Sequence, residues 1–224
     1  MGYVSENQKL PDWMTPGELL DYCRPMYPTW DRAFARKLQS DLGLETEAPL
    51  RSLSRGTRMK AALLASLAYR PELVVLDEPF TGLDPLVRDE LIRALLEVPG
   101  DGAWTVFISS HDVDEVERLA DYVGFMAEGR LLFAEPVSSL LARFAQVEVV
   151  AGDGAAPTLP PRAEWLSQAS AGRTLRFVDS GHDRPDADAR IASAFPGAAV
   201  RTSPLALREI FVILARAIGR EAAR

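Results

Sequence analysis

Two adjacent carboxylates, Asp77 and Glu78, close an aliphatic run in the middle of the chain. They follow Leu73–Leu76, a run typical of a strand buried on both faces of a parallel sheet. Ligands of such sheets bind beyond the carboxyl ends of the strands. We expect Asp77 to reach a magnesium ion through water, and Glu78 to orient and deprotonate a water that attacks a phosphate. A solvated acidic pair at a strand end is the alternative that the dipeptide leaves open.

Three other segments give this pair of carboxylates its context. Ser54 is a good N-cap, and free N–H groups at a helix start bind phosphate oxygens, although an ordinary capped helix is the better explanation of this residue taken alone. His111 ends the next apolar strand, where it could bond a terminal phosphate and the Glu78 carboxylate, or be a satisfied strand-end histidine. Gly82–Pro85, taken alone, is a turn that leads into a helix.

Composition limits the classes of protein that fit. Of the 224 residues, 47% are hydrophobic and 25% are charged, as in soluble globular proteins. The net charge of −7 disfavours a nucleic-acid surface, which usually carries a clustered basic face. The lone Cys23 cannot form an internal disulfide and fits a reducing compartment. No signal peptide opens the chain, and no apolar run approaches the roughly 20 residues of a membrane span.

Apolar periodicity and capping residues predict alternating strands and helices. Thr15 and Glu18 form a capping-box pattern, and Thr29 is expected to cap the next helix. The predicted helices are one that starts at Thr15 and breaks at Pro25, then 30–42, 54–69, 85–98 and 113–120. The predicted strands are 1–4, 74–77, 104–109, 122–126 and 131–134, with a turn at 128–129, and the strands 74–77 and 104–109 are expected to be buried. This alternation indicates an α/β domain with a mainly parallel sheet.

Composition changes after about Phe144. Residues 151–161 are rich in Gly, Ala and Pro, which indicates a linker or an exposed loop. Short strands near 147, 175–178 and 200, and helices over 186–195 and 205–218, indicate a small α+β unit. We therefore predict a first domain over 1–144, with a helical subdomain over about 14–70, and an accessory domain over 145–224.

The order and spacing of these segments resemble ATP-binding cassette (ABC) ATPases. Leu53–Thr57 is similar to the family signature, Leu73–Glu78 to the Walker B strand, Gly82–Asp84 to the D-loop, Ser110–His111 to the switch histidine, and Gly2–Glu6 to the entry of the Q-loop. Residues 129–133 and 207–211 resemble the tail of the export-type, ABC-2-like branch. The resemblance covers nearly the whole chain. It implies an α/β fold that is a partial P-loop NTPase (ABC ATPase) core with a helical subdomain, followed by a small α+β appendage.

The resemblance also implies cofactors and roles. The cofactors are ATP and Mg²⁺, with Asp77 at the metal, Glu78 as general base and His111 as phosphate sensor. Two such subunits pair head to tail in the family, so part of each site acts on the partner's nucleotide. The nucleotide-binding positions implied are Ser54, Arg55, Gly56, Thr57, Asp84 and Glu6.

Three of these positions depart from the family pattern. Arg55 stands where the signature usually has its first glycine, and it can offer a charged fork to phosphate instead of a close backbone approach. Thr57 stands at a usual glutamine. Glu6 stands at the Q-loop glutamine, where a carboxylate could still bind the metal.

No G-x-x-x-x-G-K-[ST] phosphate loop occurs in the 224 residues. Family members carry it ahead of the Q-loop, so we expect a misassigned start or a truncated gene. Because that loop supplies most of the phosphate binding, we expect these residues alone neither to bind ATP tightly nor to hydrolyse it. The strand that carries the loop lies inside the family's sheet, so we expect exposed, aggregation-prone apolar edges at Val74–Leu76 and Phe107–Ile108.

The function favoured is the ATP-binding and ATP-hydrolysing subunit of an ABC transporter. It would be an exporter subunit, peripheral on the cytoplasmic face of the membrane, coupled to a separate transmembrane permease and paired with a second ATP-binding subunit. The alternative is a catalytically incompetent binding subunit, or a truncated relic, that pairs with an intact ATPase subunit. A soluble ABC protein of DNA repair or translation is disfavoured, because neither a long coiled coil nor a second cassette is present.

Overall fold

The computed structural model describes residues 1–44, 47–97, 104–152 and 157–222. The chain forms two compact units, Met1–His111 and Asp112–Arg224, and we describe each by itself. The division between units comes before the composition change at residue 144. Compactness and domain ancestry are different criteria, so the domain boundary after 144 stays a prediction.

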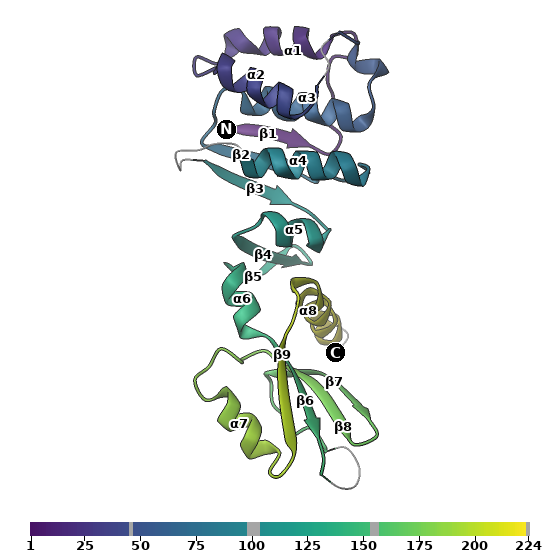
Figure 1. Ribbon diagram of the computed structural model, residues 1–224, viewed down its shortest axis with the longest axis vertical. Coiled ribbons are helices and arrows are strands. Elements are labelled where there is room, and N and C mark those ends of the chain that lie inside the picture. Colours follow the sequence, from purple (N-terminus) through teal and green to yellow (C-terminus); the bar gives the residue numbers. More distant parts are fainter. Residues whose placement is uncertain (45–46, 98–103, 153–156, 223–224) are drawn as a thin grey trace. The chain divides into compact units, whose positions relative to one another are not determined.

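Unit 1 is built on a three-stranded parallel sheet (Figure 1). Its strands are β1 (Gly2–Ser5), β2 (Leu73–Asp77) and β3 (Thr105–Ser109), in the order β1-β2-β3. The register aligns Ser5, Asp77 and Ser109. The carboxyl ends of the three strands therefore lie side by side, as a parallel sheet requires if it is to gather side chains at one edge.

The prediction of two exposed apolar edges is wrong for β2 and right in part for β3. β2 is the central strand, so β1 and β3 cover both of its edges, and Val74 and Leu76 are buried. β3 is an edge strand among the described residues, and 64% of Phe107 is exposed. The expectation that 104–109 is a buried strand is wrong for the same reason, while Ile108 is half-buried.

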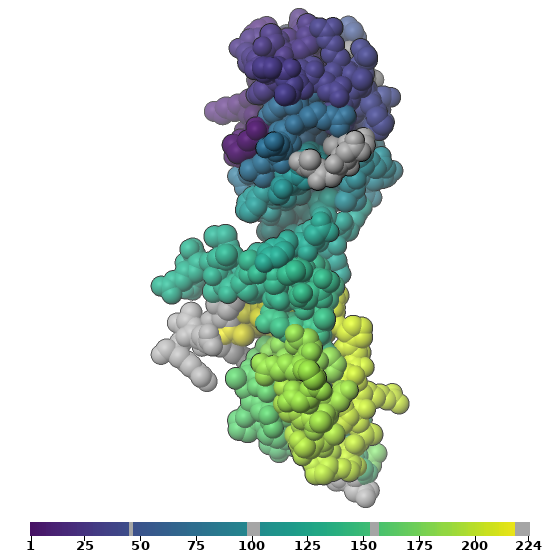
Figure 2. Space-filling model, turned by 90° about the vertical axis from the view of Figure 1, so that its left-hand side faces the viewer, coloured from purple at the N-terminus to yellow at the C-terminus, as the bar shows by residue number. Residues whose placement is uncertain are grey.

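The helices α1 and α2 lie beyond the β1 side of the sheet (Figure 1). α1 (Pro16–Cys23) has the predicted capping box, in which the Glu18 N–H donates to Thr15 Oγ1 at 3.1 Å and the Thr15 N–H donates to a Glu18 carboxylate oxygen at 2.8 Å. Two short 3₁₀ turns, η1 (Arg24–Met26) and η2 (Leu50–Ser52), flank this region. Figure 2 shows the dark purple first residues at the surface of unit 1, where Tyr69 Oη donates to the Met1 carbonyl at 2.8 Å.

The predicted cap of the second helix is wrong. α2 (Arg32–Asp41) is capped by Asp31, whose carboxylate accepts from the N–H groups of Ala33 and Phe34 at 2.9 Å each. Thr29 instead donates its hydroxyl to the Tyr69 carbonyl at 2.7 Å. The Phe34 N–H bond is the main reason that the pKa of Asp31 is lowered, because it stabilises the carboxylate form.

Two helices carry the motif segments of unit 1. α3 (Arg55–Leu67) is capped by Ser54 as predicted, and α4 (Pro85–Glu97) begins at the predicted residue. The predicted end of the latter helix, residue 98, lies outside the described residues. Lys60 of α3 is almost buried, and its ammonium donates to the Leu42 carbonyl at 2.8 Å and pairs with Glu90 of α4 at 2.6 Å. The three helices α2, α3 and α4 thus share one buried cation.

Unit 2 begins with α5 (Val113–Leu119) and a hairpin of β4 (Tyr122–Ala127) and β5 (Arg130–Pro136). Glu128 and Gly129 connect these strands at the predicted turn, both with positive φ (50° and 73°), as a type I′ turn requires. α6 (Val137–Arg143) follows and was not predicted.

A four-stranded antiparallel sheet of order β7-β8-β6-β9 completes unit 2 (Figure 1). Its elements are β6 (Ala145–Val150), β7 (Trp165–Ala171), β8 (Thr174–Asp179), α7 (Ala187–Ala194) and β9 (Ala199–Pro204), and α8 (Leu207–Ala222) ends the chain's described part. The predicted linker residues 153–156 lie outside the described residues. One apolar core lies between the sheet and α7, and a second is centred on α6 and the start of α8.

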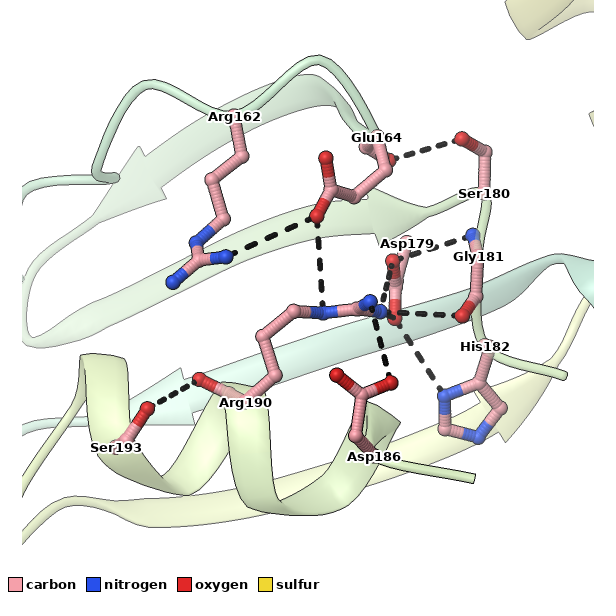
Figure 3. Close-up of polar contacts among 9 residues, drawn as sticks. All are labelled: Arg162, Glu164, Asp179, Ser180, Gly181, His182, Asp186, Arg190 and Ser193. Atoms are coloured by element: carbon pink, nitrogen blue, oxygen red, sulfur yellow. Dashed lines mark hydrogen bonds and ion pairs between the residues drawn. The ribbon is translucent and has the colours of Figure 1, made fainter. Parts of the chain in front are cut away.

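A buried ion pair ties α7 to the sheet (Figure 3). The Arg190 guanidinium donates to both Asp179 oxygens at 2.9 and 3.1 Å and to the Gly181 carbonyl at 3.1 Å. Asp179 is fully buried and also accepts from the Gly181 N–H at 3.3 Å. Glu164 lies 3.7 Å from Arg190 Nε. This cluster is a structural element of unit 2.

Candidate active site

The carboxyl edge of β2 and β3 holds the two predicted carboxylates. Ser109, which is in register with Asp77, donates its hydroxyl to Asp77 Oδ1 at 2.7 Å. The same hydroxyl oxygen accepts the Glu78 N–H at 3.0 Å, and the Ser109 carbonyl lies 3.2 Å from that nitrogen. The end of β3 therefore holds both carboxylate residues of β2.

Glu78 adopts an unusual backbone conformation, with φ at 48°. Two side chains reach its carboxylate at the same oxygen: Thr81 Oγ1 donates to Oε2 at 2.9 Å, and His111 Nδ1 lies 2.8 Å from Oε2. A non-glycine residue at positive φ is uncommon and costs free energy, and such conformations cluster at functional sites. The predicted pair of Glu78 and His111 is brought together, while the chemical roles of the two residues stay predictions.

The start of α3 presents the signature segment. Ser54 Oγ accepts from the Thr57 N–H at 3.1 Å and lies 2.9 Å from Thr57 Oγ1. Among the described residues, the N–H groups of Arg55 and Gly56 have no hydrogen-bond acceptor in the structure. Free N–H groups in the first turn of a 13-residue helix carry its positive dipole end, so this turn can receive an anion.

Arg55 links three of the motif segments. Its guanidinium lies 3.3 Å from Glu6 Oε1 and 3.4 Å from the Glu6 carbonyl. A Cβ built on Gly82 would lie 3.4 Å from Arg55 Cζ, so the guanidinium packs over the D-loop backbone. A groove of about 600 Å³ adjoins this contact and is lined by residues 6–10, Asp12, Leu53, Arg55, Arg58 and Met59.

Asp84 and Gly56 have structural roles that are visible in the structure. Asp84 Oδ1 accepts from the N–H groups of Leu86 and Val87 at 3.1 Å each, so it closes the first turn of α4. A Cβ on Gly56 would lie 2.7 Å from Val87 Cγ1, so glycine allows α3 and α4 to approach. These observations leave the predicted nucleotide roles of both residues open.

Sequence reasoning missed Thr81 and Ser109. Each hydroxyl bonds a predicted catalytic or metal-binding carboxylate. A signal was available for Ser109, because a hydroxyl residue at the end of one parallel strand lies beside the end of its neighbour. Thr81 gives a weaker signal, because its position depends on the turn that Glu78 and Thr81 close, with the Thr81 N–H 3.3 Å from the Glu78 carbonyl.

The site can contribute to metal binding but does not form a metal cage by itself. Within the described ranges, no group of three or more His, Cys, Asp or Glu side chains is placed to hold an ion. Mg²⁺ is often bound by one or two carboxylates together with waters and phosphate oxygens. Asp77 fits that pattern, because Ser109 holds one of its oxygens and its carboxylate is exposed. None of the helices in the described part of the chain is long and apolar enough to cross a bilayer.

The chain is similar to one protein family and to several curated proteins. Residues 36–117 match the family described as "AAA domain, putative AbiEii toxin, Type IV TA system". ABC transporter ATP-binding protein YtrB of Bacillus subtilis (strain 168) is 25% identical over 147 residues, which cover 66% of this chain and 50% of that protein. Molybdenum import ATP-binding protein ModC of Rhodopseudomonas palustris (strain HaA2) is 31% identical over 199 residues, covering 78% and 52%.

A solved structure agrees with these relatives in fold. It is titled "Structure of ATP binding subunit of ABC transporter", and it superposes with a TM-score of 0.55 at 23% identity, over 62% of this chain and 60% of that one. The chain spans about half the length of the curated relatives it matches.

The parallel sheet, the carboxylates at its edge and the capped helix beside them place unit 1 in the P-loop NTPase class of α/β folds. Within that class, the chain is a relative of the ATP-binding proteins of ABC transporters.

Proposed function

We propose that this chain is the ATP-binding and ATP-hydrolysing subunit of an ABC transporter that works through a separate membrane permease. The observation that carries the proposal is the contact between Glu78 and His111, 2.8 Å apart at the carboxyl edge of the sheet. A carboxylate held at that edge beside a histidine suits a base that takes a proton from water while the histidine senses phosphate. Asp77 would hold Mg²⁺, which supplies charge neutralisation to the phosphates when bound.

The signature segment would act on a nucleotide held by a second subunit. The open N–H groups of Arg55 and Gly56 and the hydroxyls of Ser54 and Thr57 would face its phosphates, and Arg55 adds a charged fork. In this arrangement Asp84 would communicate across the dimer and Glu6 would take part in coupling. The dimer would lie on the cytoplasmic face of the membrane, against the permease.

The export direction rests on sequence resemblance. Residues 129–133 form the hairpin turn and the start of β5, and 207–211 form the start of α8, and both segments resemble the export-type branch. One relative is named for molybdenum import, so relatives alone leave the direction open. Transport into and out of vesicles that contain the assembled transporter would decide it.

Replacing the proposed base tests the hydrolytic function. In protein purified from its native cell, Glu78→Gln is expected to lower ATP turnover by about 100-fold or more while Mg²⁺–ATP binding is kept, because the amide cannot accept the proton. Glu72→Gln is the matched control, since Glu72 is an exposed glutamate that precedes the other end of β2. Turnover in Glu78→Gln above half that of the unchanged protein would exclude Glu78 as the base.

A binding subunit without hydrolysis of its own is the second candidate. One observation favours it: the signature helix keeps its cap and its open N–H groups. On this proposal, the chain is inactive alone and stimulates a subunit that carries the loop. Arg55→Ala would then remove the stimulation, whereas Glu78→Gln would leave it unchanged.

A further inference from the structure

We infer that Thr81 and Ser109 are positioning residues that each hold one named oxygen of the two carboxylates. They leave Glu78 Oε1 to meet the attacking water and Asp77 Oδ2 to meet the metal shell. This inference rests on the proposed function for the roles of Glu78 and Asp77. It adds which oxygen of each carboxylate does the chemistry and which side chains decide that.

The carboxylate of Glu78 is held on one side only. Both donors, Thr81 Oγ1 at 2.9 Å and His111 Nδ1 at 2.8 Å, meet Oε2, and no other described residue bonds Oε1. An ionised carboxylate can only accept hydrogen bonds, so the nitrogen that faces it carries a proton. The inference therefore assigns neutral His111 to the Nδ1–H tautomer.

The backbone places the Thr81 hydroxyl at this oxygen. Glu78 has φ 48° and Gly82 has φ 72°, and the Thr81 N–H closes the turn onto the Glu78 carbonyl at 3.3 Å. Thr81 itself is half-buried, which restricts its side chain. Loss of the hydroxyl would remove one of the two donors that select the orientation of the Glu78 carboxylate.

Ser109 holds one oxygen of the Asp77 carboxylate in the same way. Its hydroxyl donates its one proton to Asp77 Oδ1 at 2.7 Å and accepts the Glu78 N–H at 3.0 Å. A single hydroxyl therefore sets the rotation of one carboxylate and anchors the backbone of the next residue. Asp77 Oδ2 has no hydrogen bond from the described residues.

A merely structural role would affect stability and leave the chemistry intact, so the activity test uses paired variants. In native protein, Thr81→Val is expected to lower kcat about tenfold with KM for Mg²⁺–ATP within twofold, and Thr81→Ser to restore kcat. Ser109→Ala should instead raise the Mg²⁺ concentration needed for half activity about tenfold, and Ser109→Thr should restore it.

A second measurement does not depend on turnover. The chain has two histidines, so nitrogen NMR of the imidazoles resolves the His111 tautomer directly. We expect Nδ1–H in the neutral ring, and we expect three-bond couplings of the Glu78 side chain to report one rotamer that becomes averaged in Thr81→Val. Thr81→Ser should keep the single rotamer.

The outcomes separate the inference from the function on which it rests. If the native protein has no ATPase activity, the hydrolytic function fails, and the two NMR measurements still decide the positioning. A neutral His111 in the Nε2–H form, or Glu78 couplings that are the same in Thr81→Val, would overturn the inference whatever the turnover. Equal kcat in the active native protein and in Thr81→Val would overturn it too.

Discussion

Gly56 shows how one residue of the signature serves the fold as well as the proposed site. It is buried in the first turn of α3, opposite Val87 of α4, and a Cβ there would lie 2.7 Å from the valine methyl group. Sequence reasoning assigned Gly56 only a nucleotide role, because the partner helix is not visible in a local pattern. The structure adds helix packing as a second reason for glycine at this position.

Gly56→Ala should therefore destabilise unit 1 by about 1–3 kcal/mol, the usual cost of overpacking. Pairing it with Val87→Ala, which removes the clashing methyl groups, should make the double variant more stable than the sum of the single changes predicts. Urea unfolding followed by circular dichroism measures this. Gly152→Ala is the control, since its Cβ would have open space. A Gly56→Ala protein as stable as that control would contradict the clash.

Among the elements, those with complete local signals were predicted and those made by tertiary pairing were not. The Thr15–Glu18 box and the Ser54 cap are confirmed, because each is decided within four residues. Thr29 was the wrong cap, since the Tyr69 carbonyl, 40 residues away in sequence, takes its hydroxyl. β7 was missed because Ser167–Ala171 has no apolar alternation and forms a strand only by pairing with β8.

The buried pair of Asp179 and Arg190 belongs to the same class of features that local sequence does not reveal. Arg190→Met should lower the stability of unit 2 by roughly 3–5 kcal/mol, because it leaves the fully buried Asp179 without its cation. Trp165 is the only tryptophan of unit 2 and is buried, so its fluorescence reports the transition.

Arg176→Met is the matched control for that change. Arg176 lies on β8 of the same sheet and pairs with Glu148 at 2.6 Å, but 64% of its side chain is exposed. Exposed pairs contribute about 0–1 kcal/mol, so this variant should unfold close to the unchanged protein. Similar losses in the two variants would show that the Arg190 pair contributes no more than a surface pair.

On the scale of the molecule, the order of motifs along the chain predicted the α/β class and the meeting of Asp77, Glu78 and His111 at one edge. The hydroxyls that hold these residues were not predicted, since their contacts depend on register and on one turn. The sheet order also escaped prediction. β2 was expected to have an exposed edge, yet it lies between β1 and β3.

The position of β3 at the edge of the described sheet should promote self-association of the protein at high concentration. Phe107→Thr is expected to reduce self-association in sedimentation and light-scattering measurements, because it removes a large exposed apolar side chain from β3, the outer strand of the sheet among the described residues, and keeps a residue that favours strands. Leu96→Thr on α4 is the control, since Leu96 is 59% exposed but lies on a helix. Equal reductions in both variants would assign the association to general surface hydrophobicity and not to the strand edge.

The left-handed backbone of Glu78 has a consequence for how this position can change over evolutionary time. Holding a glutamate at φ 48° costs on the order of 1–3 kcal/mol, which glycine would not incur. A lineage selected only to fold would gain stability by replacing this glutamate with glycine, and a lineage selected for chemistry must keep the glutamate at that cost. The identity of residue 78 is thus a trade-off between stability and activity. In a chain no longer selected for turnover, replacement of Glu78 by glycine should be among the first changes at this site, because it removes the conformational cost.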